Sequence, residues 1–94
     1  MAFVYMLRCS NGGLYTGFTL DLRRRVAQHN AGRGAKYTRM HRPVRLIWAA
    51  ELCSEHQARR AEVLVKRLGT PRKRRLAAGE ISLWQACPQI WQEE

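Results

Sequence analysis

The sequence predicts a small α+β domain with a three-stranded, mainly antiparallel sheet flanked by helices, in the order ββα-β-αα. Two short segments of alternating apolar residues are joined by an Asn-Gly turn, which is typical of a β-hairpin. A third apolar run follows a helical segment. After that run come two segments that begin with helix-capping residues. The 94 residues form one domain with a small core.

The first two strands are expected at residues 3–8 and 14–18, where apolar side chains alternate. A three-residue loop over 11–13 pairs Cys9 with Tyr15. The two tyrosines of this hairpin, Tyr5 and Tyr15, then share one face of the sheet. A loop shorter by one residue places them on opposite faces, and the sequence leaves both registers open.

A helix follows the hairpin. Thr19 or Asp21 caps its start, it runs to about Asn30, and Gly32 stops it. The basic segment beyond this glycine is expected to be a loop with one helical turn around Tyr37.

The third strand is expected over residues 44–53. Ser54 caps the next helix, with Gln57 at the capping-box position. This helix ends near Gly69, and its apolar stripe consists of Ala58, Ala61, Leu64, Val65 and Leu68. Thr70 is expected to cap the last helix.

The last helix has Pro71 at its first position and ends at Gly79. We expect the domain to span residues 1–80. Residues 81–94 are then a C-terminal tail that holds Trp84 and Trp91.

Charge is the strongest signal in the composition. The chain has 17 Lys and Arg against 7 Asp and Glu, a net charge of +10, and 14 of the cations are arginine. Arginine binds phosphate oxygens with two parallel hydrogen bonds, so this bias favours a nucleic-acid partner over a membrane surface. The cations expected to contact phosphate are Arg33, Lys36, Arg39, Arg42, Arg72, Lys73, Arg74 and Arg75.

Other features of the composition set limits. The apolar runs are too short to span a bilayer and the N-terminus does not resemble a signal peptide, so the expected compartment is the cytoplasm. The three cysteines, Cys9, Cys53 and Cys87, form no Cys-x-x-Cys pair. We expect buried free thiols rather than disulfides or a zinc site.

Five side chains together supply the chemistry that cutting a phosphodiester needs. The phenols of Tyr5 and Tyr15 and the imidazole of His29 can handle protons. Arg25, four residues before His29, lies on the same helix face and can neutralise a phosphate. Glu62 is the one acid among eight cations between residues 59 and 75 and can hold a metal ion. A structural alternative makes Glu62 an ordinary helix ion-pair partner.

In order and spacing these residues resemble the GIY-YIG nuclease family, in particular its small stand-alone members. The resemblance covers residues 3–68 and rests on Phe3-Val4-Tyr5, Tyr15-Thr16-Gly17, Arg25, His29 and Glu62. It implies that Glu62 binds Mg²⁺ or Mn²⁺ and that both tyrosines lie in the active site. Gly17 is expected to give a bulge or to let the substrate backbone come close.

Three positions depart from the family pattern. Phe3 stands where the first motif usually has glycine, and Thr16 replaces the isoleucine of the second motif. Many relatives also have an asparagine some 12–15 residues after the glutamate. Residues 74–77 contain none.

The resemblance therefore predicts a metal-dependent endonuclease that acts on DNA and selects structure over sequence, as in DNA repair. One rival is a non-catalytic nucleic-acid-binding module with the same fold. A second is an adaptor that docks on a repair enzyme through residues 81–94. The sequence leaves open whether Tyr5, Tyr15 or His29 is the general base.

Overall fold

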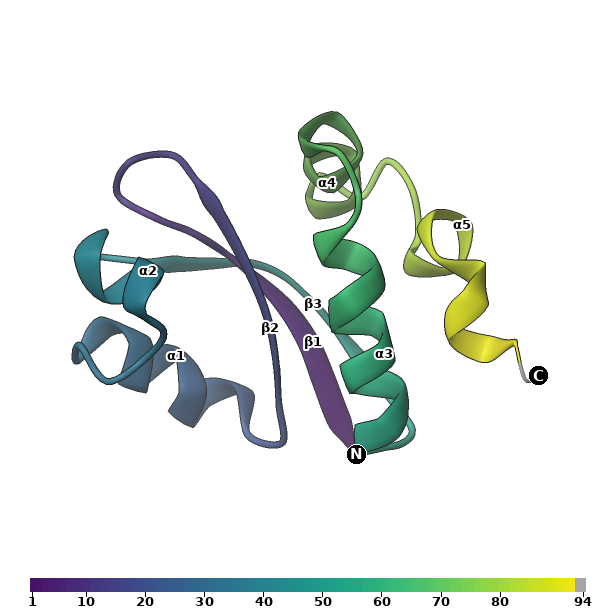
Figure 1. Ribbon diagram of the computed structural model, residues 1–94, viewed down its shortest axis with the longest axis horizontal. Coiled ribbons are helices and arrows are strands. Elements are labelled where there is room, and N and C mark those ends of the chain that lie inside the picture. The colour runs from purple at the N-terminus through teal and green to yellow at the C-terminus, as the bar shows by residue number, and fades with distance from the viewer. Residues whose placement is uncertain (93–94) are drawn as a thin grey trace.

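The computed structural model describes residues 1–92 and has the predicted α+β architecture (Figure 1). The sheet consists of β1 (Ala2–Arg8), β2 (Leu14–Thr19) and β3 (Arg45–Leu52). The helices are α1 (Leu22–Asn30), α2 (Lys36–Met40), α3 (Glu55–Lys66), α4 (Thr70–Ala77), α5 (Leu83–Ala86) and the 3₁₀ turn η1 (Pro88–Trp91). The strand order is β2-β1-β3 and both pairs are antiparallel, so the sheet is antiparallel throughout.

Alternate residues of the central strand β1 divide the core between two faces. Val4 and Met6 belong to the larger cluster, which α3, α4 and the C-terminal segment complete. Tyr5 and Leu7 point to the opposite face and pack with side chains of α1. Figure 1 shows α1 and α2 on one side of the sheet and α3, α4 and α5 on the other. This division places the Tyr5 phenol beneath α1.

The hairpin has an odd-numbered loop, but its register differs from the predicted one. Tyr15 pairs with Leu7 rather than with Cys9, and Gly17 pairs with Tyr5. The Cys9 amide donates to the carbonyl of Gly13 at 2.9 Å, so the turn is one residue nearer the N-terminus than expected. The partner of Tyr15 thus changes by two residues along β1. Because side chains alternate with a period of two, this change keeps both tyrosines on one face of the sheet.

Side-chain caps begin the two longest helices as predicted. The Asp21 side chain accepts from the Arg24 amide, and Ser54 accepts from the Gln57 amide. The prediction for α4 was wrong by one residue, because its N-cap is Gly69 and Thr70 is its first helical residue. The apolar stripe of α3 faces the core as expected.

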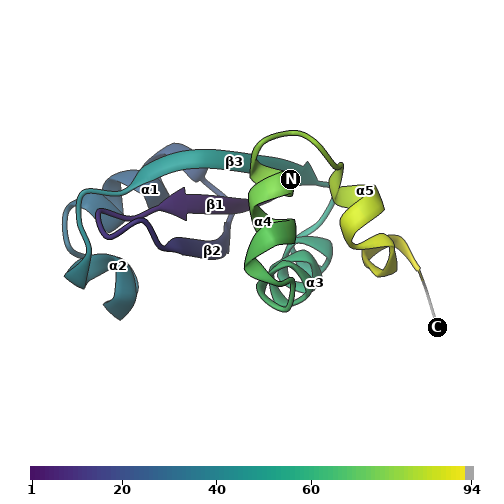
Figure 2. The same ribbon diagram turned by 90° about the horizontal axis from the view of Figure 1, so that it is seen from above.

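The C-terminal segment packs on the domain. Leu83, Cys87 and Ile90 are buried and join the larger core cluster. Figure 2 shows α5 beside α3 and α4, at the end of the molecule away from α2. Trp84 and Trp91 remain exposed on this segment, with their ring centroids 5.1 Å apart.

Two of the three cysteines are buried free thiols as expected, Cys9 and Cys87. The expectation is wrong for Cys53, which follows the end of β3 and is exposed, with its thiol donating to Gln57 Oε1 at 2.9 Å. Among residues 1–92, no helix has the length and apolar character that crossing a membrane requires.

Candidate active site

Tyr5 and His29 form a buried pair between the sheet and α1. The Tyr5 hydroxyl lies 2.8 Å from His29 Nε2, and both residues are at most 1% exposed. Tyr15 lies beside them, with its ring centroid 5.1 Å from His29 and 6.5 Å from Tyr5. The hairpin register and the last turn of α1 thus bring three of the predicted site residues into one cluster.

Burial and a nearby cation shift the pKa of both members of the pair. Burial raises the pKa of Tyr5 to about 12, an effect that Arg25 partly opposes and that Tyr15 and Glu62 increase. Burial lowers the pKa of His29 to about 4, and repulsion by Arg25 adds to this. At neutral pH the pair is therefore a protonated phenol and a neutral imidazole.

The lowered pKa of His29 makes folding sensitive to acid. Between pH 6.5 and pH 4 the unfolded chain binds a proton at this position that the folded chain does not bind, so stability falls as the pH falls. We expect His29 to account for a loss of about 2 kcal/mol between pH 7 and pH 4.5.

Urea unfolding at the two pH values measures this loss. The loss should shrink by that amount in His29→Gln, whereas replacing the exposed His56 by Gln should leave it unchanged. Equal acid sensitivity in His29→Gln and the unmodified chain would show that His29 is not buried in its neutral form.

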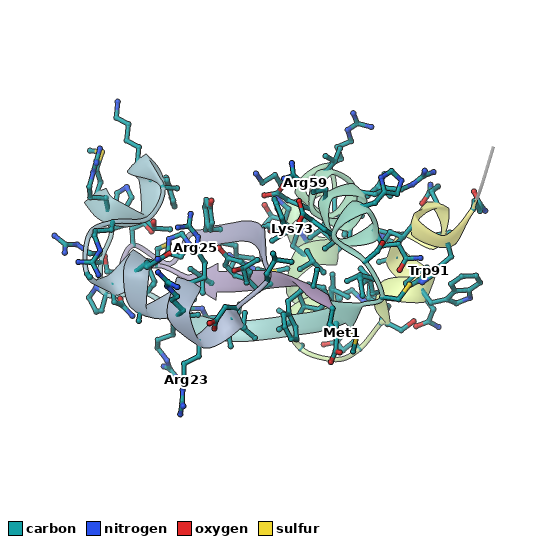
Figure 3. The ribbon with its side chains drawn as sticks, turned by 90° about the horizontal axis from the view of Figure 1, so that it is seen from below. Met1, Arg23, Arg25, Arg59, Lys73 and Trp91 are labelled. Atoms are coloured by element: carbon teal, nitrogen blue, oxygen red, sulfur yellow. The ribbon has the colours of Figure 1, made fainter. Side chains whose placement is uncertain are left out.

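Arg25 comes from the middle of α1 and is half-buried, unlike its neighbours Arg23 and Arg24. Figure 3 shows Arg23 and Arg25 on opposite sides of this helix. The Arg25 guanidinium donates to Gln28 Oε1 at 3.1 Å. Its positive charge lowers the pKa of both Tyr5 and His29.

Arg25 also lines a surface cavity of about 500 Å³ that lies between α1, the end of β2 and the start of α3. Arg24 and Arg59 line the same cavity, and the Arg59 guanidinium lies 4.7 Å over the Phe18 ring. A phosphate that entered here would meet Arg25, which is the one member of the five predicted site residues that lines this cavity.

Gly17 lies directly opposite Tyr5 in the hairpin. A Cβ at Gly17 would lie 2.5 Å from the Tyr5 hydroxyl oxygen and 2.7 Å from Cζ. The close approach that this glycine allows is therefore made by the Tyr5 ring. The approach of a substrate backbone to Gly17 stays a prediction.

Glu62 is on α3, and its side chain is 21% exposed. Its Oε2 lies 3.3 Å from Lys66 Nζ, and that amine lies 5.9 Å from the centroid of the Tyr15 ring. The negative charge of Glu62 is also among the causes that raise the pKa of Tyr5. The ion pair predicted by the structural alternative exists, but the carboxylate also belongs to the surroundings of the two tyrosines.

The oxygen ligand available for a metal ion here is one carboxylate. Among residues 1–92, no group of three or more His, Cys, Asp or Glu side chains could hold an ion by itself. Mg²⁺ is commonly held by one or two carboxylates, with water and substrate phosphates as its other ligands. A single half-buried carboxylate such as Glu62 fits that requirement when water and substrate phosphate supply the other ligands.

The predicted phosphate-binding cations lie on two separate surfaces. On the loop around α2, Arg33, Lys36 and Arg39 are exposed, whereas Arg42 donates to the carbonyls of Arg39 and Asn30. On α4, Arg72 and Arg74 are exposed, Lys73 is half-buried, and Arg75 lies 3.5 Å from Glu80.

The residues on the far side of His29 were not predicted from the sequence patterns. Thr38 is fully buried and its Oγ1 lies 2.7 Å from His29 Nδ1. A Cβ at Gly34 would collide with the same nitrogen, so only glycine fits there. The available signal was the Gly-Ala-Lys-Tyr-Thr-Arg segment at 34–39, which has no helical or strand period that points to His29.

Comparison with known proteins identifies the family of the chain. The model of the GIY-YIG catalytic domain matches residues 1–75. A UPF0213 protein of Streptococcus pneumoniae is 50% identical over 72 residues, which are 77% of this chain and 73% of that protein. A UPF0213 protein of Halobacterium salinarum is 47% identical over 76 residues, which are 81% of this chain and 99% of that protein.

Solved structures agree as well. The solution NMR structure of the UPF0213 protein BH0048 from Bacillus halodurans is 35% identical, with a TM-score of 0.55 over 99% of this chain and 100% of that one. The protein EF2693 from E. faecalis is 32% identical, with a TM-score of 0.54 over 85% of this chain and 86% of that one. With the domain match and these relatives together, the chain belongs to the GIY-YIG family and, within it, to the UPF0213 proteins.

Proposed function

We propose that this protein is a metal-dependent endonuclease that hydrolyses phosphodiester bonds in DNA. Membership of the GIY-YIG family implies a nuclease domain. The observation that supports the finer proposal most is the position of the Tyr5 hydroxyl. It lies 2.8 Å from His29 Nε2, and the charges of Arg25 and Glu62 both affect its pKa. Proton transfer, phosphate binding and a metal ligand are thus available around one oxygen.

The proposed reaction begins with a water that attacks phosphorus. Its proton passes to the Tyr5 oxygen as the Tyr5 proton passes to His29 Nε2. The bond from phosphorus to the leaving oxygen breaks as the new bond forms, and the leaving oxygen takes a proton from solvent. His29 is fully buried, so it acts through Tyr5 rather than on the water directly. The half-buried Tyr15 is suited to position the water or the phosphate.

Arg25 binds the phosphate, whose negative charge increases in the transition state. The same phosphate offsets the repulsion between Arg25 and a protonated His29. Substrate binding thus makes His29 a better proton acceptor than it is in the free protein.

Glu62 would hold the metal ion, Mg²⁺ or Mn²⁺, with water and substrate phosphate as the remaining ligands. When bound, such an ion supplies positive charge to the phosphate and the leaving oxygen. Lys66, whose amine lies 3.3 Å from the Glu62 carboxylate and 5.9 Å from the centroid of the Tyr15 ring, is the ion-pair partner of this acid.

The selection of DNA structure over sequence is proposed from the kind of contact that the surface offers. The exposed cations of the α2 loop and of α4 are suited to phosphate, and phosphate contacts carry no sequence information. With about six such contacts, affinity should fall by about 10³ between 50 and 200 mM salt. Fluorescence anisotropy with a labelled oligonucleotide measures this dependence. A flat response would count against these surfaces.

A cleavage assay tests the function. Labelled single-stranded, duplex, flap and forked oligonucleotides, in DNA and RNA, are incubated with the protein in Mg²⁺, Mn²⁺ or EDTA. The proposal predicts internal cuts in a DNA substrate with either metal ion and none in EDTA. Salt-dependent binding to the whole panel without any cut would instead favour a non-catalytic binding module.

A further inference from the structure

The His29 imidazole is held by hydrogen bonds on both of its ring nitrogens. Nε2 lies 2.8 Å from the Tyr5 hydroxyl, and Nδ1 lies 2.7 Å from Thr38 Oγ1. Thr38 is fully buried in α2, and its Oγ1 also lies 3.0 Å from the carbonyl oxygen of Ala35. Four groups from three elements of the fold therefore form one buried chain of hydrogen bonds.

We assign the direction of each bond in this chain from its last member. A carbonyl oxygen only accepts, and the Ala35 oxygen, which also accepts from the Arg39 amide at 2.9 Å, is the acceptor to which the single Thr38 hydroxyl proton is assigned. Thr38 Oγ1 must then accept from His29, which places a proton on Nδ1. A neutral imidazole has one N–H, so Nε2 carries none and accepts from the Tyr5 hydroxyl.

We propose that Thr38 is a positioning residue for the reaction, because its hydroxyl fixes His29 in the tautomer that can take the Tyr5 proton. This inference rests on the proposed function and adds a third member to the Tyr5–His29 pair. Gly34 leaves room for this ring, because a Cβ at that position would collide with His29 Nδ1.

The same hydrogen bonds also stabilise the protonated form of His29. When the Tyr5 proton moves to Nε2, the imidazolium still donates from Nδ1 to Thr38, whose own donation to Ala35 strengthens the oxygen as an acceptor. Thr38 gains and loses no proton in the cycle. Its contribution is to orient the ring and to stabilise the positive charge that develops there.

Substitution of Thr38 by Val and by Ser separates this role from packing. Val keeps the shape and removes the hydroxyl, whereas Ser keeps the hydroxyl. Long-range ¹H–¹⁵N NMR spectra at pH 7 report which ring nitrogen of His29 carries the proton. We expect the Nδ1–H form in the unmodified protein and in Thr38→Ser, and loss of that single form in Thr38→Val. Replacing the exposed Thr70 by Val should change nothing.

Steady-state cleavage gives the second readout. Thr38→Val should lower kcat by about 10- to 100-fold, a part of the 10²–10⁴ that a general base contributes, with KM little changed. Thr38→Ser should restore most of the rate. Unchanged kcat in a folded Thr38→Val variant would overturn the inference.

The spectrum of the unmodified protein is decisive even if Thr38→Val does not fold. An Nε2–H tautomer there would overturn the inference, because His29 could not then accept from Tyr5. A protein that cuts no oligonucleotide but shows the Nδ1–H tautomer would contradict the proposed function while leaving the assigned bond directions intact.

Discussion

Glu62→Gln should lower the cleavage rate by about 10³ or more while leaving the fold intact. The change keeps the size of the side chain and removes the charge proposed to hold the metal ion, whose effect on phosphoryl chemistry amounts to several kcal/mol. The cost in stability should be small. The ion pair that is lost, with Lys66 at 3.3 Å, is partly exposed, and such helix pairs contribute about 0.2–0.5 kcal/mol.

Two variants on the same helix are the controls. Arg60 lines a different surface of α3, with His56 and Val63, so Arg60→Gln should cut nearly as well as the unmodified protein. Lys66→Gln removes the ion-pair partner of Glu62, together with a cation 5.9 Å from the Tyr15 ring, and leaves the Glu62 carboxylate in place. If the importance of Glu62 lay in that ion pair, Lys66→Gln would reproduce the defect, and we expect that it does not.

Binding separates catalysis from folding in this series. In EDTA, Glu62→Gln should bind the oligonucleotide at least as tightly as the unmodified protein, since a negative charge that faces phosphate has been removed. Simultaneous loss of binding and cutting in a folded variant would show that Glu62 has a structural role in the binding surface and is not a ligand of the metal ion.

Arg25→Gln should lower single-turnover cleavage by about 10²–10³, the range that removal of one preorganised group from a transition state costs. The guanidinium has a second measurable effect, since its repulsion helps to lower the pKa of His29. Its removal should raise that pKa, which an NMR titration of the His29 ring can follow. Burial remains the larger cause, so the pKa should stay below its usual value.

Arg23→Gln is the matched control for this variant, because Arg23 lies on the opposite side of the same helix (Figure 3). It removes the same charge from the same element. An equal loss of cleavage in both variants would mean that the net charge of α1, rather than contact between Arg25 and a phosphate, supports the reaction.

Local patterns were sufficient to predict the strands and the helices α1, α3 and α4 in their order, because the boundaries of these elements have their own chemical signals. Asp21 and Ser54 begin α1 and α3 through side-chain caps, and Gly32 and Gly79 adopt positive φ angles just beyond the helices they follow. The same-face placement of the tyrosines depends only on an odd-numbered loop, so it held although the register was wrong.

Features decided by contacts between distant segments could not be predicted from those patterns. The hairpin turn is fixed partly by bonds to the α2 segment. The Ser10 amide donates to the His41 carbonyl at 2.9 Å, and Asn11 donates to the Tyr37 hydroxyl at 3.0 Å. Thr38 reaches His29 across nine residues for the same reason. The C-terminal helices span four residues each, which is too short to show a helical period.

A crystal structure of the unmodified protein with Mn²⁺ and a non-cleavable phosphorothioate oligonucleotide would test the central claim most directly. The claim is that Tyr5, Tyr15, Arg25, His29 and Glu62 form one phosphodiesterase site. We predict an anomalous Mn²⁺ peak at the Glu62 carboxylate, with one phosphate that contacts both the ion and Arg25. A peak remote from Glu62, or a Glu62 carboxylate more than about 12 Å from Arg25, beyond the reach of one metal–phosphate unit, would contradict the account.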